Sequence, residues 1–374
     1  MQKEIQEKPI LEAFSVDDFH PEDAEGIVEL FRAVYEDSYP VRLFYNPREI
    51  TVANREGSAY SIVARTPAGK VVGATHLFRH ANLPNMYEWG AGLVLKECRT
   101  LGVNQALSEF LHHQFLPTQP HIEEIFGEPV CNHTHLQKAC NAFGYVETGI
   151  EAALMPAEAY MNEKSAKGRV ATLCCFRSCA SKPHRIFLPA DYEGILRKIY
   201  TRMDDQRELC LSAAPVPETS STEAESQIFE SAGVSRLTFF SAGRDFAARL
   251  TDLENSARKK KAVVFQSYVN LTQPWAGQIA SILRQRGYFF GGLLPRWFDG
   301  DGLLMQKLHC PPDFDGIVLF SEFSKELLHY IRGDRDRARE DFETKEALTD
   351  MEELTATISP EHLGGNREAR NDGK

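Results

Sequence analysis

The stretch that decides the fold is residues 88–111, which read Glu88-Trp-Gly-Ala-Gly-Leu-Val-Leu95, then Lys-Glu-Cys-Arg99-Thr-Leu-Gly102-Val-Asn104, then Gln-Ala-Leu-Ser-Glu-Phe-Leu111. The apolar run that ends at Leu95 predicts a buried strand. The apolar side chains after it recur at helical spacing: Val103, Leu107, Phe110 and Leu111. Gly102 stands in the connecting loop, where the backbone must turn closely. Because the free N–H groups of a helix start point outward together, this loop predicts an anion site.

The composition is that of a globular protein with two domains. The chain has 374 residues, of which 43% are hydrophobic and 25% charged. No apolar run approaches the roughly 18 residues of a membrane span. The charged start lacks the apolar segment of a secretory signal, so we expect a cytoplasmic protein without a membrane partner. The formal charge of −11 argues against a sequence-independent nucleic-acid surface.

The eight cysteines are scattered and do not resemble a disulfide framework. Cys174, Cys175 and Cys179 cluster in a predicted strand and its exit. Neighbouring residues on a strand point to opposite faces, so we do not expect these thiols to hold zinc with His184. Reduced, mostly buried thiols and no metal site are expected.

The segments around the central stretch have clear periodic patterns. Residues 17–34 predict an amphipathic helix, and residues 58–78 a hairpin around the turn at 66–70. Between them, Tyr39 and Tyr45 lie on a proline-bearing loop, where exposed aromatic side chains often line a binding site. The alternative is that both rings pack under the loop with Phe44. After the central helix come a short strand, a polar helix over 132–143 that Gly144-Tyr145 closes, and a strand pair.

That order of elements resembles the GNAT superfamily of acyl-coenzyme A-dependent N-acetyltransferases. The most specific piece is Arg99-x-x-Gly102-x-Asn104, followed by Asn132 and then Gly144-Tyr145. Ser38-Tyr-Pro with Tyr45 and Pro47 is similar to a bacterial subgroup. The resemblance covers about residues 10–180 and implies an α/β fold, a central mixed sheet flanked by helices, with acetyl-CoA as co-substrate. The cofactor residues that it implies are Leu93, Val94, Leu95, Arg99, Thr100, Leu101, Gly102, Val103, Asn104 and Asn132.

The resemblance also implies residues for catalysis. Glu88 is the candidate general base, with a solvated glutamate at the strand end as the alternative. Cys140 stands where the family often has a tyrosine as general acid, although a free cysteine on a helix is more often a small core residue. Asn104 is larger than the family's residue at that place and is expected to cap the helix start, and Asn132 either contacts the pantetheine arm or caps the next helix.

The second half of the chain repeats this architecture. A strand, Asn270, a helix, Gly287-Tyr288 and a strand echo the arrangement around Asn132 and Gly144-Tyr145. The second copy has only residues 241–245, Ser-Ala-Gly-Arg-Asp, where the pyrophosphate loop would stand. We therefore expect a degenerate GNAT-like lobe without cofactor that walls the acceptor site. The expected domains are 1–180 and 181–332, with a flexible linker near 212–230 and a disordered charged tail over 333–374.

Two functions remain open at this point. The first is an N-acyltransferase that moves an acetyl group from acetyl-CoA to an amine of a small molecule or peptide, as a monomer or homodimer. The second is a binding or regulatory protein that keeps the fold without turnover. Cys140 and the degenerate second lobe favour the second function, and the intact loop from Arg99 to Gly102 favours the first.

Overall fold

The computed structural model describes residues 13–37, 39, 41–79, 83–156, 168–203 and 206–357, with side chains through residue 344. The first half contains β1 (Ser15–Asp18), α1 (Asp23–Tyr35), α2 (Pro47–Glu56), β2 (Ala59–Arg65), β3 (Val71–Phe78), β4 (Met86–Val94), α3 (Val103–Phe110), β5 (Glu124–Gly127), α4 (His135–Ala142), β6 (Val146–Pro156) and β7 (Arg169–Ser178). The second half contains β8 (His184–Leu188), α5 (Glu193–Tyr200), β9 (Arg207–Leu211), β10 (Glu223–Phe229), β11 (Val234–Ser241), α6 (Phe246–Lys259), β12 (Val264–Asn270), α7 (Ala276–Arg284), β13 (Phe289–Leu294), β14 (Gly302–Leu308) and α8 (Glu322–Thr357). Ser38 and Pro40, part of the bacterial-subgroup motif, lie outside the described residues.

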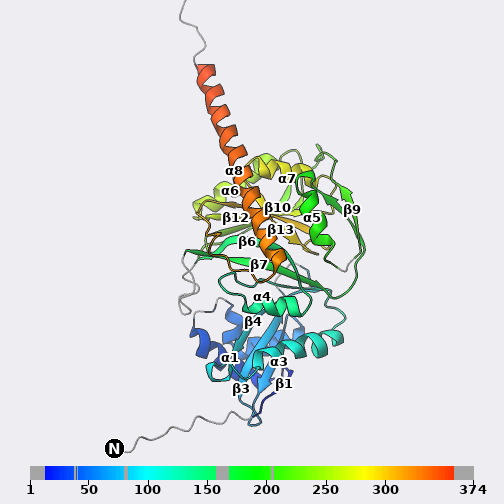
Figure 1. The fold of residues 1–374 in the computed structure, drawn as a ribbon, viewed down its shortest axis with the longest axis vertical. Helices are drawn as coiled ribbons and strands as arrows, with labels where there is room; N and C mark the ends of the chain where they lie inside the picture. Colours follow the sequence, from blue (N-terminus) through cyan, green and yellow to red (C-terminus); the bar gives the residue numbers. More distant parts are fainter. Residues whose placement is uncertain are drawn as a thin grey trace, which may run out of the picture.

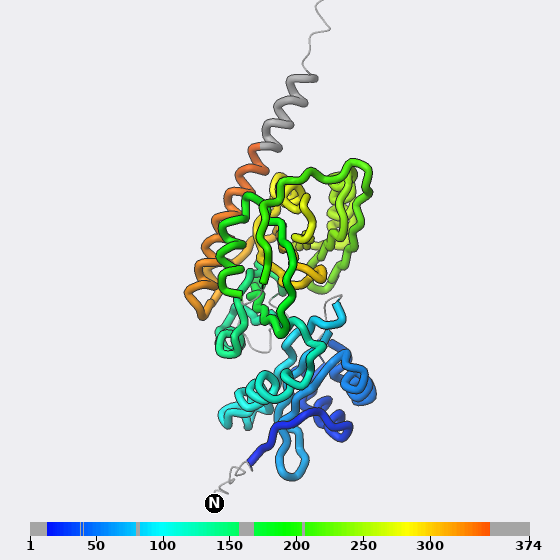
Figure 2. The backbone as a smooth tube through the Cα atoms, turned by 90° about the vertical axis from the view of Figure 1, so that its right-hand side faces the viewer, coloured from blue at the N-terminus to red at the C-terminus, as the bar shows by residue number. Residues whose placement is uncertain are grey.

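One mixed sheet of 12 strands runs through both halves, in the order β1-β2-β3-β4-β5-β7-β6-β13-β14-β12-β11-β10. β8 and β9 form a separate parallel pair. The series β11, α6, β12, α7, β13, β14 repeats β4, α3, β5, α4, β6, β7, and in both series the first two strands are parallel and the others antiparallel. This confirms the expected mixed α/β fold and its repeat. We call residues 13–178 the first lobe and residues 184–357 the second lobe (Figures 1 and 2).

The two lobes meet where β6 lies beside β13, its counterpart in the repeat. These strands pair only at Gly149 and Gly292. A Cβ atom on Gly149 would lie 2.4 Å from the carbonyl oxygen of Gly291 and 2.4 Å from the Cα of Gly292. The Gln306 side chain of β14 fastens the join, since its Oε1 accepts from the Ala152 N–H and its Nε2 donates to the Ile150 carbonyl, both at 2.8 Å. The close approach of β6 and β13 therefore requires glycine at positions 149 and 292.

The two faces of the sheet are covered differently. The largest apolar core packs α3 to α8 on one face and includes Leu107, Cys140 and Ile331. On the other face α1 and α2 cover the outer strands of the first lobe. The rest of that second face we call the shared face, because strands of both lobes form it. Its apolar side chains are Met86, Phe126, Cys174, Phe176, Tyr268, Leu294 and Leu304, with Trp297 and Phe298 packed against them.

Two expectations about mobile segments were wrong. The expected linker contains β10, an edge strand that pairs with β11 through its backbone while several of its polar side chains face solvent, so composition alone hides it. The expected disordered tail is helical as far as Thr357. A narrow stripe of α8 packs on the body through Leu327, Ile331 and Ala338, and Asp334 is buried against Arg284 at 2.5 Å. Residues 358–374 lie outside the described residues.

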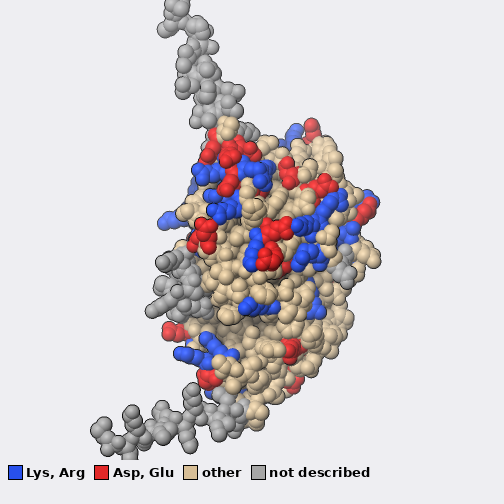
Figure 3. Space-filling model, in the orientation of Figure 1, with Lys and Arg blue, Asp and Glu red and all other residues tan. Residues whose placement is uncertain are grey.

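The described helices and surface were inspected for features of membrane and nucleic-acid binding. None of the helices described here combines the length and the apolar character that a membrane crossing requires. On the face drawn in Figure 3, acidic and basic side chains are interspersed. The described part of that face carries no continuous basic surface of the kind that sequence-independent nucleic-acid binding uses.

Candidate functional site

The pairing between β4 and β5 ends early, and we call the stretch of β4 beyond its last pair with β5 the opening. The two parallel strands pair only from Met86 to Glu88 on β4. Beyond that point β4 bulges, because its register against β3 shifts and Ala91 has a φ of 51°. β4 then continues to Val94 beyond its last pair with β5. Beyond Glu88, β4 therefore has no strand partner on its β5 side among the described residues.

The predicted anion loop lies at the far end of β4. Gly102 has a φ of 78°, and a Cβ atom there would meet nothing within 4 Å. The first helical hydrogen bond runs from the Ala106 N–H to the Gly102 carbonyl at 3.0 Å, so the amides of residues 103–105 precede it. Arg99 fixes the loop to the strand, since its Nε donates to the Val94 carbonyl at 3.3 Å. A left-handed glycine followed by a helix start is well suited to a phosphate group.

The other predicted cofactor residues divide between loop and core. Leu93 and Val94 are buried on opposite faces of β4, and Val103 packs over Gly73. Thr100, Leu101 and Gly102 are exposed. They form the surface of the loop rather than its support.

The two asparagines do not cap helices. The N-cap of α3 is Gly102, and the Asn104 Oδ1 instead lies 3.9 Å from the position that a Cβ on Gly92 would take. The N-cap of α4 is Thr134, two residues after the half-buried Asn132. The cap expected at Asn104 was therefore wrong, and Asn132, for which capping was one of two alternatives, does not stand at the N-cap of α4. The side chain of Asn104 leans toward the bulge of β4, beside the opening.

Tyr39 and Tyr45 take part in aromatic packing. The Tyr39 and Phe44 rings lie 5.1 and 4.4 Å from that of Phe31, and the Tyr39 N–H donates to the Tyr45 hydroxyl at 3.0 Å. This arrangement matches the alternative in which the loop aromatics pack on α1. Phe44 also lies 6.4 Å from Phe78, the cross-strand neighbour of Glu88. The aromatic cluster therefore lies next to Phe78, which is the strand neighbour of Glu88.

Glu88 lies at the last pair of β4 with β5, at the edge of the opening. Its cross-strand neighbours are Phe78 and Phe126, and its Oε1 lies 3.2 Å from the position of a Cβ on Gly90. The side chain is partly buried, unlike a solvated glutamate at a strand end. Burial raises the pKa of Glu88 to about 7, while Arg236 lowers it and Glu151 raises it. A carboxyl with such a pKa is suited to accept a proton at neutral pH.

Cys140 lies on the other face of the sheet from Glu88. It is 1% exposed in the core under α4, and its Sγ lies 3.8 Å from the position of a Cβ on Gly127, the last residue of β5. The structure does not bring the two predicted catalytic residues together. All eight cysteines are free, and among the described side chains no three His, Cys, Asp or Glu groups are arranged to hold a metal ion.

A polar network on the shared face escaped the sequence analysis. The Arg236 Nε of β11 donates to the Gln266 Oε1 at 2.9 Å, and its Nη2 lies 3.5 Å from the Glu151 Oε1. Gln266 Nε2 donates to the same Glu151 oxygen at 2.6 Å, and Thr172 Oγ1 donates to the other at 2.8 Å. We call Arg236, Gln266, Glu151 and Thr172 the bridging network, because it joins β11 and β12 to β6 and β7. The one available signal was the presence of glutamates, Glu147 and Glu151, within the apolar strand 146–156.

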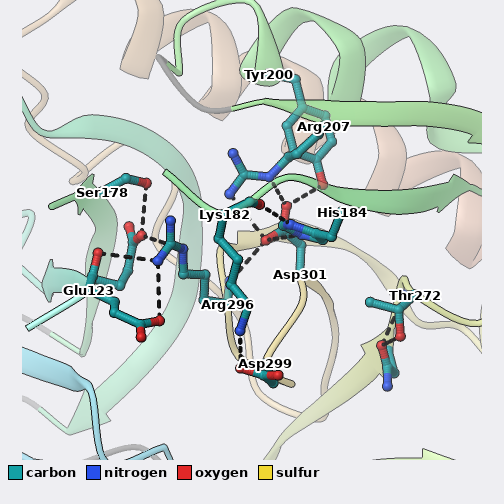
Figure 4. Close-up of polar contacts among 12 residues, drawn as sticks. Glu123, Ser178, Lys182, His184, Tyr200, Arg207, Thr272, Arg296, Asp299 and Asp301 are labelled. Atoms are coloured by element: carbon teal, nitrogen blue, oxygen red, sulfur yellow. Dashed lines mark hydrogen bonds and ion pairs between the residues drawn. The ribbon is translucent and has the colours of Figure 1, made fainter. Parts of the chain in front are cut away.

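A second buried network fixes the loop between β13 and β14 (Figure 4). Asp301 is fully buried and accepts from the Tyr200 hydroxyl at 2.9 Å, the Arg207 Nε at 2.5 Å and the Arg296 N–H at 2.9 Å. His184 Nε2 lies 3.3 Å from the same carboxylate. Despite its burial, the His184 and Arg207 contacts lower the pKa of Asp301 to about 2.

That loop reaches across the join between the lobes. The Arg296 Nε lies 3.3 Å from the Glu124 Oε2 of β5. The next residue, Trp297, places its ring 5.6 Å from Phe126 of the first lobe and 5.5 Å from Tyr268 of the second. Burial raises the pKa of Glu124 to about 8, so its contact with Arg296 is a polar contact with a largely protonated carboxyl at neutral pH. The buried polar contacts of Asp301 and Arg296 therefore hold an aromatic wall over the shared face, beside the strand pair that carries Glu88.

The second lobe has no counterpart of the opening among its described residues. β11 and β12 pair along six residues, from Val234 to Phe239 on β11. At the start of α6, a Cβ on Gly243 would lie 1.8 Å from the Ser220 carbonyl, and the Gly243 N–H donates to the Thr222 Oγ1 at 3.1 Å. At the start of α7, the Gly277 N–H donates to the Ser212 Oγ at 2.7 Å. Residues 212–222, within the expected linker, therefore occupy both helix starts.

The chain was compared with known proteins. No family model matches it, and no curated protein matches its sequence. Among solved structures, it is similar to a GNAT-family acetyltransferase from Staphylococcus aureus Mu50, with 15% identity, 45% of this chain and 100% of that chain covered, and a TM-score of 0.33. It is also similar to the ribosomal-protein-S5-alanine acetyltransferase from Vibrio fischeri (14%, 45% and 93%, TM-score 0.34) and the ribosomal-protein-S18-alanine N-acetyltransferase from Escherichia coli (10%, 46% and 96%, TM-score 0.35).

Proposed function

We propose that this chain is an N-acetyltransferase that moves an acetyl group from acetyl-CoA to an amine of a small molecule or peptide. The observation that carries the proposal is the opening beside β4, which has Glu88 at one end and the Gly102 helix start at the other. The strand from Glu88 to Val94 spans about 20 Å, which is room for an extended chain between an anion site and a base.

The proposed chemistry assigns one task to each end of the opening. The amides of residues 103–105 bind the diphosphate, and the main chain around Val94 aligns the pantetheine arm. Glu88 accepts a proton from the amine, directly or through water, as the amine nitrogen attacks the thioester carbonyl carbon. The carbon–sulfur bond then breaks, and coenzyme A leaves as a thiolate that takes up a proton from water. Main-chain N–H groups beside the opening stabilise the developing oxyanion.

Calorimetry followed by a turnover assay tests this proposal. We expect one acetyl-CoA to bind per chain, because residues 212–222 occupy the corresponding helix starts of the second lobe. Release of free thiol is then measured across a panel of small amines and peptides. Glu88→Gln should lower kcat by about 100-fold or more with little change in acetyl-CoA affinity. Failure to bind acetyl-CoA would reject the proposal.

The burial of Cys140 favours the second candidate, a GNAT-fold protein that binds acyl-CoA without turnover. Packing alone explains a thiol that is 1% exposed in the core, and no catalytic role is needed to account for it. Binding of acetyl-CoA without thiol release on any amine would support this candidate. If turnover is found, Cys140→Ser tests the thiol as proton donor, and an unchanged kcat would contradict that role.

A further inference from the structure

Glu88 lies between two aromatic neighbours in the sheet. Its cross-strand partners are Phe78 on β3 and Phe126 on β5, and partners that stand opposite each other project from the same side of a sheet. Phe78 is partly exposed, whereas Phe126 is 1% exposed in the apolar cluster of the shared face. The candidate base therefore has an aromatic ring on either side of it.

Gly90 lets the Glu88 carboxyl and the Phe78 ring come together. A Cβ atom on Gly90 would lie 3.2 Å from the Glu88 Oε1 and 3.3 Å from the Phe78 Cε1, so both atoms lie within 3.3 Å of one point above the main chain. Gly90 precedes the bulge at Ala91 and belongs to the stretch of β4 that has no partner in β5. The carboxyl oxygen that would accept the amine proton therefore lies beside an aromatic ring at the opening.

The aromatic surroundings continue away from Glu88 in both directions. Trp297 of the second lobe lies 5.6 Å from Phe126, and on the other side Phe44 lies 6.4 Å from Phe78. Phe78 and Trp297 are both partly exposed. We call Phe78, Phe126 and Trp297 the aromatic frame. Because both lobes contribute to it, the frame spans the join beside the candidate base.

The charges of the shared face suit a positively charged ligand. Glu88 supplies a carboxyl, while two cations on this face already have carboxyl partners. Arg236 lies 3.5 Å from Glu151, and Arg296 lies 3.5 Å from Glu123. A ligand with its own carboxylate would therefore meet like charge at Glu88 without a ready cation to balance it.

We propose that the acceptor is an arylalkylamine, in which an aromatic ring carries a primary amine through a short alkyl chain and no carboxylate stands beside the amine. The inference rests on the proposed function and names its acceptor class. The nitrogen lies at the Glu88 Oε1 over Gly90, and the ring packs on the aromatic frame. Aromatic rings favour edge-to-face partners, and the Trp297 and Phe126 rings already meet at 72°.

Three small amines that differ by one group test this inference. Phenethylamine has the ring and the amine, ethylamine lacks the ring, and phenylalanine adds a carboxylate on the carbon that carries the amine. With saturating acetyl-CoA, kcat/KM should be about 10- to 100-fold higher for phenethylamine than for ethylamine, because its ring is buried. It should be at least about 10-fold lower for phenylalanine than for phenethylamine. Equal values for the three amines, or a preference for phenylalanine, would overturn the inference and leave the proposed function standing.

Substitutions in the aromatic frame then locate the ring of the acceptor. Phe78→Leu and Trp297→Leu keep an apolar side chain and should each lower the ratio of kcat/KM for phenethylamine to that for ethylamine by about 3- to 10-fold. A general loss of structure or catalysis cancels in this ratio, because both amines use the same base and donor. Phe320→Leu is the matched control, on a ring that is 42% exposed between β14 and α8, and should leave the ratio unchanged. An unchanged ratio in both frame variants would overturn the inference, and if one of them fails to fold, the other decides.

Absence of turnover on every amine would reject the proposed transfer reaction rather than the acceptor class. Calorimetric titration with phenethylamine in the presence of acetyl-CoA then decides the inference. Binding that weakens in Glu88→Gln and Phe78→Leu, and is unchanged in Phe320→Leu, would support it. Failure of phenethylamine to bind would overturn it.

Discussion

Substitutions at Gly102 give the most direct test of the anion site. Gly102 has a left-handed φ of 78°, lies exposed at the start of α3, and offers open space to a Cβ atom. A side chain there is therefore tolerated by the fold, with a backbone cost of about 1–2 kcal/mol. We expect Gly102→Ala, Gly102→Gln and Gly102→Glu to share this loss of stability and to differ in acetyl-CoA binding.

The charge of the new side chain should dominate that difference. A carboxylate about 6 Å from one phosphate charge is repelled by about 3 kcal/mol at an effective dielectric constant of 20. That energy corresponds to about a 100-fold loss of affinity. Gly102→Gln has nearly the same volume without the charge, so the ratio of the two dissociation constants isolates the electrostatic part.

Calorimetric titration with acetyl-CoA measures the three dissociation constants, and thermal unfolding checks that the variants share the fold. The gap between Gly102→Glu and Gly102→Gln should narrow as salt rises, because ions screen an exposed charge. Equal affinities for these two variants would refute the placement of the diphosphate at this helix start. Wild-type affinity in all three would remove the loop from the site altogether.

Two further predictions concern stability. Gly149→Ala should lower the free energy of unfolding, measured in urea, by about 3 kcal/mol, because the new Cβ would meet backbone atoms at 2.4 Å. The control is Gly194→Ala on α5, which has open space around its Cβ and should be neutral or stabilising. Equal effects would contradict the close crossing. The pKa of Asp301 falls from 3.8 to about 2 on folding. Its carboxylate therefore contributes about 2 kcal/mol to the free energy of unfolding above pH 3.8, and this contribution is lost as the pH falls toward 2. Asp301→Asn should lower stability at pH 7 by about 3–5 kcal/mol, since it removes the buried carboxylate that pairs with Arg207, and should remove that part of the acid dependence. An unchanged slope of stability between pH 4 and 2 would be inconsistent with this role.

Local patterns predicted the parts of the fold that depend on neighbouring residues. The strand, loop and helix around Gly102 follow from apolar spacing and one glycine, and the repeat follows from the similar order of elements in the two halves. β10 and the part of α8 beyond residue 332 were missed for a different reason. An edge strand needs only backbone partners, and α8 packs through a stripe that its charged neighbours dilute.

The polar groups of the shared face could not be predicted from the sequence. Arg236 and Glu151 are 85 residues apart, and only the order of strands in the sheet brings them together. The opposite placement of Glu88 and Cys140 likewise depends on which face of the sheet each element covers. Sequence patterns identify a residue type that suits a chemical role, whereas proximity across a sheet depends on long-range pairing.

The edge-to-edge join of β6 and β13 has a consequence for symmetry. Two identical subunits paired through the same strand would present identical residues on both sides of a twofold axis. Here the paired halves belong to one chain, so each can change alone. One half retains a helix start open to an anion. In the other half, residues 212–222 fill the helix starts, and Arg236 is contributed to the shared face. Covalent linkage of the two halves thus permits a division of labour that a symmetric dimer cannot have.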